Sequence, residues 1–164
     1  CGTTGWLDDF ELVKKKCEEK ETAFIYSSNF SIGVNIFFKV NKYLSELMNK
    51  YDNPYKISIE ETHHKEKLDS PSGTAISLAN GIIEKNNSFD SWTKDKNSNS
   101  ISIISRRKNK KIGIHNISFE SKFDKIKIQH EAFSRDAFAK GSIIAAKWIK
   151  NKKGIFKMDD ILGF

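Results

Sequence analysis

The sequence has little cysteine, little proline and no long hydrophobic run. Its 164 residues include two cysteines, Cys1 and Cys17, which are too few for a disulfide framework. No stretch approaches the roughly 18 apolar residues that a membrane helix needs, and no basic and apolar leader opens the chain. These absences favour a reduced, cytoplasmic protein with no membrane association.

Arginine is also scarce, although the chain is basic. It carries 28 Lys and Arg against 21 Asp and Glu, a net charge of +7, yet only three residues are arginine. A basic balance favours anionic partners, but proteins that recognise nucleic acid usually rely on arginine. We therefore expect a small anionic ligand such as a dinucleotide or dicarboxylate, and no nucleic acid. A non-catalytic basic binding or assembly module stays open as the alternative, on the cluster Arg106, Arg107, Lys108, Lys110 and Lys111.

Hydrophobic periodicity predicts an α+β fold. Spacing of three and four residues indicates helices over 8–20, 32–50, 75–85 and 135–150. Short β-rich or alternating segments indicate strands over 22–26, 56–61, 101–105, 112–120 and 125–131, with a polar loop over 86–100. We expect a mixed sheet of about four strands with helices on one face, plus a separate strand and helix near the start.

One short segment combines histidines, a lysine and a helix start. His63 and His64 leave a predicted strand, and Lys67 follows shortly after them. A Pro-Ser-Gly-Thr sequence then marks a helix N-terminus, where the amides of Gly73 and Thr74 can bind an anion. A titratable pair, a cation and anion-binding amides together predict a carboxylate substrate that undergoes proton transfer.

Less specific interpretations of this segment stay open. Adjacent histidines are often only polar surface, and a Ser-Gly-Thr helix start often serves only as a cap, with Ser70 or Ser72 as the capping residue. The remaining histidines, His115 and His130, stand in strand patterns and are expected to be structural. Histidines and carboxylates could bind zinc, but no His-x-x-x-His or His-Glu-x-x-His spacing occurs. We therefore expect no metal site.

The same segment resembles the signature of the dihydrodipicolinate reductase family. The family pattern is matched at Glu61, His63, His64, Lys67, Asp69, Pro71, Ser72, Gly73, Thr74 and Ala75. Similarity extends to Gly2–Gly5, Ser28–Asn35, Arg107 with Gly113 and His115, His130–Arg135, and Phe138 to Gly141. Ile114 stands where the family has glutamate, and we expect little consequence from this departure.

The resemblance implies an activity and a set of site residues. The enzyme would use NADPH or NADH to reduce 4-hydroxy-tetrahydrodipicolinate to tetrahydrodipicolinate, in lysine and diaminopimelate biosynthesis, as a homotetramer. His63 would take the acid/base role and Lys67 the proton-donor role, while His64, Gly73 and Thr74 would bind substrate carboxylates. The nicotinamide end of the cofactor site would be lined by Gly2, Thr3, Thr4, Ser27, Ser28, Asn29 and Phe30.

The resemblance also implies a domain organisation. Residues 1–30 would be the remnant of a Rossmann-type nucleotide-binding domain, 31–134 the substrate-binding and oligomerisation domain, and 135–164 a helix and tail that return to the nucleotide domain. The glycine-rich turn that binds pyrophosphate in such folds does not occur in the sequence. The chain also opens on a Gly-Thr-Thr-Gly loop, so we expect an upstream segment, and weak dinucleotide binding by the isolated chain.

Overall fold

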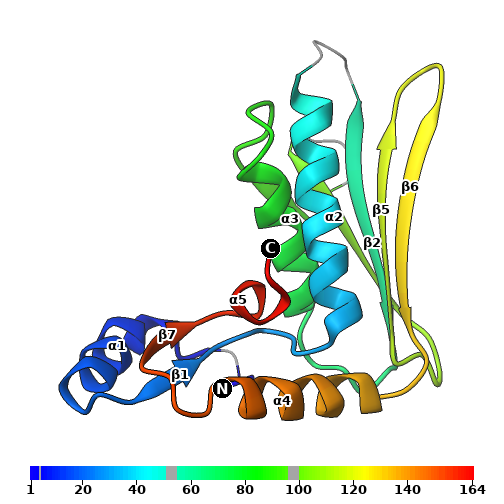
Figure 1. Cartoon of the computed structure of the whole chain (residues 1–164). Coiled ribbons are helices and arrows are strands. Elements are labelled where there is room, and N and C mark those ends of the chain that lie inside the picture. Colours follow the sequence, from blue (N-terminus) through cyan, green and yellow to red (C-terminus); the bar gives the residue numbers. More distant parts are fainter. Residues whose placement is uncertain (4, 51–54, 96–99) are drawn as a thin grey trace. The chain divides into compact units, whose positions relative to one another are not determined.

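The computed structural model describes residues 1–3, 5–50, 55–95 and 100–164 (Figure 1). The chain forms two compact units, one of residues 1–35 with 135–164 and one of residues 36–134. Among the described residues, no helix has the length and apolar character needed to cross a membrane.

The larger unit contains a mixed, five-stranded sheet in the order β3-β4-β2-β5-β6. Its strands are β2 (Lys56–His63), β3 (Trp92–Thr93), β4 (Ile101–Arg107), β5 (Gly113–Glu120) and β6 (Lys125–Ala132). β4 runs parallel to β2 and β3, whereas β5 is antiparallel to β2 and β6. The α+β class and the mixed sheet are thereby confirmed. The fifth strand, β3, falls in the segment expected to be a loop, because two residues are too few to show an alternating pattern.

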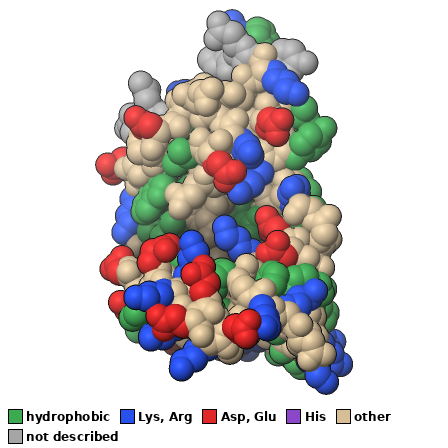
Figure 2. All heavy atoms as spheres, turned by 60° about the vertical axis from the view of Figure 1, so that its left-hand side comes forward, with side chains coloured by type: hydrophobic (Ala, Val, Ile, Leu, Met, Phe, Trp, Pro, Cys, Tyr) green, Lys and Arg blue, Asp and Glu red, His purple; other side chains and the backbone are tan. Residues whose placement is uncertain are grey.

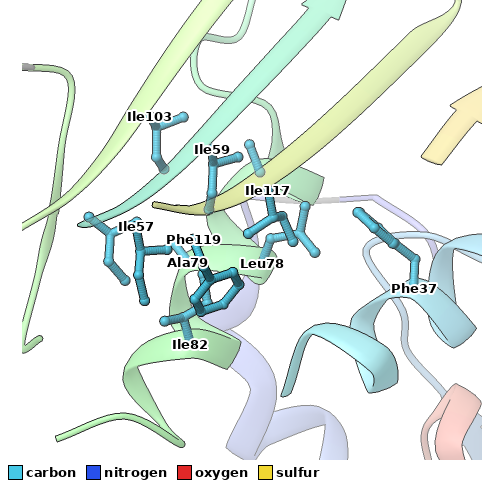
Figure 3. Packing of buried hydrophobic residues seen from close by; sticks show 11 residues of the cluster. Phe37, Ile57, Ile59, Leu78, Ala79, Ile82, Ile103, Ile117 and Phe119 are labelled. Carbon is cyan, nitrogen blue, oxygen red and sulfur yellow. The ribbon is translucent and has the colours of Figure 1, made fainter. Parts of the chain in front are cut away.

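Two helices cover one face of this sheet (Figure 1). They are α3 (Gly73–Ile83) and, within this unit, residues 36–49 of α2 (Ile32–Asn49). In α3, Ala75, Leu78, Ala79 and Ile82 recur at three- and four-residue spacing and are fully buried. Figure 3 shows Leu78, Ala79 and Ile82 against isoleucines of the strands. The buried core is Phe37, Ile57, Ile59, Ala75, Leu78, Ala79, Ile82, Ile101, Ile103, Ile117 and Phe119.

The smaller unit is built around two short parallel strands, β1 (Ala23–Ile25) and β7 (Gly154–Phe156). Its helices are a 3-10 turn η1 (Leu7–Asp9), α1 (Phe10–Glu19), α4 (Asp136–Trp148) and α5 (Met158–Leu162). Its buried core is Ile25, Phe30, Ala145 and Met158. The sequence predicts β1 but not β7, because a three-residue strand carries almost no periodic signal.

Helix α4 lies directly against the backbone of the segment after β1. A β-carbon added at Gly141 would lie 1.8 Å from the carbonyl oxygen of Phe30 and 2.7 Å from its carbonyl carbon. Real β-carbons do not approach backbone atoms this closely, so only glycine permits this packing. Gly141 therefore fixes α4 against the loop that contains Phe30.

Replacing Gly141 with alanine is expected to destabilise the smaller unit. In an exposed helix the same change would stabilise by about 1 kcal/mol, because alanine has a higher helix propensity than glycine. A lower melting temperature would therefore show that the steric clash at position 141 outweighs this propensity. Thermal unfolding measured by circular dichroism tests this, with Ser142→Ala on the exposed face of α4 as the control. A melting temperature at or above that of the unchanged protein would contradict the close contact.

Candidate active site

One face of β2 changes from apolar to polar along its length. Ile57 and Ile59 are buried in the core, and the next two residues on this face, Glu61 and His63, are also buried. In the sheet register, Glu61 lies opposite His115 of β5 and Ser105 of β4. Strand pairing therefore gathers polar side chains at one end of the core.

Glu61 is a fully buried carboxylate with several hydrogen-bond donors around it. The amide of Ser72 donates to both of its oxygens at 3.1 Å, and the Ser105 hydroxyl donates to Oε1 at 2.7 Å. The Arg107 guanidinium lies 3.6 Å from Oε1. Burial by itself would raise the pKa of Glu61, but the hydrogen bonds from Ser105 and Ser72 and the nearby His63 hold it below its ordinary value. The carboxylate is therefore ionised at neutral pH.

His63 lies between this carboxylate and β5. Its Nδ1 is 3.4 Å from Oε2 of Glu61, and its ring packs edge-on against His115 at a centroid distance of 5.0 Å. A β-carbon added at Gly113 would lie 3.2 Å from Nε2, so the glycine leaves room at that nitrogen. Burial lowers the pKa of His63, Glu61 opposes this effect, and Lys67 reinforces it. The neutral imidazole is thus favoured in the resting protein.

His115 belongs to the same cluster, which its strand pattern alone does not indicate. Its Nε2 is 3.2 Å from the Ser72 hydroxyl and 3.8 Å from Oε2 of Glu61. Burial lowers the pKa of His115 to about 3. The His115 ring is therefore neutral at physiological pH, and it packs edge-on against the His63 ring.

The loop after β2 carries Lys67 and is attached to β4. Lys67 Nζ lies 2.6 Å from Oδ1 of Asp69. Arg107 donates to the backbone oxygens of Lys67 at 3.4 Å and of Asp69 at 2.6 Å. His64 Nδ1 lies 2.9 Å from Oε2 of Glu66. Arg107 thus ties the loop to the strand next to β2.

The start of α3 contacts the cluster of Glu61, His63 and His115 through Ser72. Ser72 is the N-cap, and its hydroxyl accepts from the Ala75 amide at 3.2 Å. Gly73 and Thr74 form the first helical positions, where the amides point along the axis and the helix dipole is positive. Pro71 precedes the cap and therefore lies outside the first helical turn.

The structure therefore brings some predicted residues together. Glu61 contacts both His63 and Ser72, so His63 lies near the first turn of α3. Lys67 is close enough to affect the pKa of His63. His64 pairs with Glu66 on the loop.

The residues predicted to line the nicotinamide lie in the smaller unit. The Cys1 nitrogen donates to the Ile25 oxygen at 2.6 Å, and the Ser27 amide donates to the Cys1 oxygen at 3.2 Å. A β-carbon added at Gly2 would lie 3.4 Å from the Phe30 ring. The Ser27 hydroxyl donates to the Asn29 oxygen at 2.6 Å, and the Trp6 ring donates to the Thr3 oxygen at 2.9 Å. The opening residues and the loop 27–30 therefore lie side by side. Thr4 lies outside the described residues.

One group of side chains has the composition of a metal site. Ligand atoms of Glu61, His63 and His115 lie within 4.8 Å of one another, and all three residues are buried. Sequence spacing does not reveal this group, because strand pairing and not helical periodicity assembles it. The Glu61 oxygens already accept hydrogen bonds, and a guanidinium lies 3.6 Å away, which disfavours a further cation.

The basic cluster of the sequence is largely paired with carboxylates. Arg106 Nη2 lies 2.9 Å from Glu60, and Lys111 Nζ lies 2.9 Å from Glu131. Arg107 is occupied by Glu61 and by backbone oxygens. Figure 2 shows a face on which side chains of both charge signs are interspersed. Three of the five basic side chains of this cluster therefore lie next to carboxylates.

Sequence reasoning missed the roles of Glu61, Ser105 and Arg107 in the site. Glu61 had a detectable signal: it continues the apolar face of Ile57 and Ile59, where a charge is out of place. Ser105 and Arg107 become neighbours of this face only through the parallel pairing of β4 with β2. No local pattern indicates that pairing.

Comparison with known proteins gives a consistent result. Residues 33–162 match the family model described as dihydrodipicolinate reductase, C-terminus. The chain is 47% identical over 162 residues to the 4-hydroxy-tetrahydrodipicolinate reductase of Christiangramia forsetii, covering 98% of this chain and 67% of that protein. It is 37% identical over 172 residues to the enzyme of the same name from Methanocaldococcus jannaschii, covering 99% of this chain and 61% of that protein.

A solved structure is also similar. It is a dipicolinate-bound dihydrodipicolinate reductase from Paenisporosarcina sp. TG-14, with a TM-score of 0.71 and 25% identity. The similarity covers 95% of this chain and 61% of that one. The chain thus spans about two thirds or somewhat less of the length of these relatives.

His115 is expected to make the stability depend on pH. Its pKa is about 3 when folded and 6.5 ordinarily, so between these values the unfolded chain binds a proton that the folded chain does not. Stability contributed by the neutral ring is therefore lost as the pH falls, by about 2 kcal/mol between about pH 6.5 and about pH 5. The melting temperature should fall less between these two pH values in His115→Gln than in the unchanged protein. Equal slopes would show that the ring titrates normally.

Proposed function

Because the chain belongs to the dihydrodipicolinate reductase family, we propose that the full-length protein reduces 4-hydroxy-tetrahydrodipicolinate to tetrahydrodipicolinate with NADPH or NADH, in lysine and diaminopimelate biosynthesis. The observation that carries the proposal is the buried contact of Glu61 with His63 and with the N-cap of α3, inside the segment that matches the family signature. This contact supports an acid/base role for His63 near the positive end of a helix, an arrangement that suits reduction of a dicarboxylate.

The helix start and the loop after β2 suit a dicarboxylate. The amides of Gly73 and Thr74 lie at the positive end of α3 and would bind one carboxylate. His64 and Lys67 lie on the loop and would bind or neutralise the rest of the negative charge. The dipicolinate bound by the Paenisporosarcina enzyme is a ligand of this chemical class.

Proton transfer falls to His63 and Lys67. His63 is buried and has a lowered pKa, so it releases a proton readily once it has accepted one. Lys67 has its ammonium next to Asp69 and would act as the proton donor. When bound, the reduced nicotinamide supplies the hydride. Exclusion of water from this buried cluster strengthens each electrostatic contact.

The smaller unit would hold the nicotinamide end of the cofactor. Gly2, Thr3, Ser27, Ser28 and Asn29 offer backbone and small polar groups, and the two loops that carry them lie side by side. Phe30 adds an apolar ring, and Thr4 is included by the resemblance. These residues fit the end of the cofactor that carries no phosphate.

The proposal includes the organisation of the full protein. Segments 1–30 and 135–164 would belong to the nucleotide domain, and 31–134 would form the substrate-binding and oligomerisation domain. We propose a cytoplasmic homotetramer in which the sheet of the larger unit provides subunit contacts. The two helices α2 and α3 cover one face of this sheet and leave the opposite face available for subunit contacts (Figure 1), which supports this assignment. Light scattering of the full-length protein measures the oligomeric state.

Removing either proton-transfer group is expected to cut turnover. His63→Gln and Lys67→Met should each lower kcat by about 100-fold or more, because a positioned acid or base contributes at least that much. The measurement is substrate-dependent oxidation of NADPH and NADH by the full-length protein.

Lys65→Met is the matched control, because Lys65 is exposed on the same loop and has no assigned role. It should retain its turnover. Unchanged kcat in both His63→Gln and Lys67→Met would remove these residues from the mechanism. An unchanged protein that oxidises neither cofactor with this substrate would refute the function itself.

A further inference from the structure

Glu61 has no role in the proposed chemistry, yet it is the most deeply buried charged residue of the cluster. Its side chain is 0% exposed, and it occupies a position on β2 where the alternation demands an apolar residue. Burial of an ionised carboxylate costs several kcal/mol unless donors compensate for the lost water. A charge kept at such a position requires an explanation beyond core packing.

The carboxylate connects four segments of the larger unit. It accepts hydrogen bonds from Ser72 at the start of α3 and from Ser105 on β4, and it lies 3.4 Å from Nδ1 of His63 on β2. His115 on β5 is 3.8 Å away. A shift of any one of these segments would move Glu61 relative to His63.

The His63 ring packs against His115 but lacks a hydrogen bond at Nδ1 in the part of the chain that the structure describes. Its Nδ1 is buried and has no hydrogen-bond partner among the described residues, and the carboxylate at 3.4 Å is just beyond good hydrogen-bond geometry. A proton on Nδ1 would point at Oε2 of Glu61. Nε2, next to Gly113, would then carry the lone pair of the neutral ring and be the nitrogen that accepts a proton.

We propose that Glu61 is a positioning residue for the reductase reaction: its carboxylate fixes the orientation of the His63 ring and stabilises the protonated ring during proton transfer. This inference rests on the proposed function. Glu61 itself does not touch the substrate. It acts through His63, as carboxylates do when they fix the tautomer of a catalytic imidazole.

The charged groups around His63 differ in whether they favour protonation of its ring. Lys67 on the loop and Arg107 on β4 disfavour the protonated ring, and His115 on β5 is neutral. Asp69, on the loop, favours protonation but is paired with Lys67. Glu61 is thus the main group that opposes burial and the two cations, so its removal should strongly disfavour protonation of His63.

Direct titration of His63 tests this without substrate. In the full-length protein with 13C-labelled histidine, the His63 resonance, assigned with His63→Gln, is followed by NMR as a function of pH. In Glu61→Gln, whose side chain has the same shape but no charge, His63 should titrate at lower pH than in the unchanged protein. An identical midpoint in the two proteins would overturn the proposal.

Kinetics supply the second readout. Glu61→Gln should lower kcat by about tenfold or more while KM for the substrate changes by less than about twofold, and the acidic limb of the pH profile should move to lower pH. Glu60→Gln is the matched control, because Glu60 is next to Glu61 on β2 but pairs with Arg106. An equal loss in both variants, or a loss confined to KM, would overturn the positioning role.

Failure of the proposed function and failure of this role of Glu61 give different results. If the unchanged protein does not reduce the substrate, the function fails, and the His63 titration still decides whether Glu61 controls the protonation of His63. If Glu61→Gln does not fold, Ser105→Ala replaces it, since it removes one donor to the carboxylate and keeps the charge. A several-fold loss of kcat is then expected, and an unchanged kcat would overturn the proposal. Stoichiometric Zn²⁺ in the purified protein, lost in His115→Gln, would also overturn it by assigning the cluster to a metal.

Discussion

The alternation of β2 places the hydrophobic core and the candidate site on a single face of one strand. Ile57 and Ile59 pack under α3, and Glu61 and His63 continue the same face. Because β2 is hydrogen-bonded to both β4 and β5, its position is fixed on two sides. The isoleucine packing that stabilises the larger unit therefore also holds the polar cluster in place, since a slip of one residue would turn both to the other face.

The cluster tolerates a buried carboxylate because its donors come from different segments. Ser72 and Ser105 replace the lost water, and Arg107 contributes positive charge at 3.6 Å. The same environment keeps His63 and His115 neutral at rest. The ionised carboxylate of Glu61 thus lies beside the neutral imidazole of His63, whose Nδ1 lacks a hydrogen bond from any described residue. Burial disfavours protonation of this imidazole and the neighbouring carboxylate opposes that effect, a combination that suits an acid/base site.

Much of the fold could be predicted, because long amphipathic helices and alternating strands carry their own signal. The boundaries of α2 and β5 agree with expectation to within one residue. β3 and β7 were missed because two or three residues cannot show a period, and both form by pairing with a strand that is already in place. The sequence also does not indicate that position 141 requires glycine, because the requirement comes from contact with the backbone of Phe30, which is distant in the sequence.

By itself, the sequence determined the α+β class, the segment that carries the chemistry and the family resemblance, since these depend on residues that are neighbours along the chain. Only the tertiary structure decided that His115 lies against His63, that Arg107 holds the loop of Lys67, and that Glu61 joins His63 to the N-cap of α3. These contacts depend on strand register and on which strands pair. Pairing is set by the burial of the whole apolar face, which no single segment specifies.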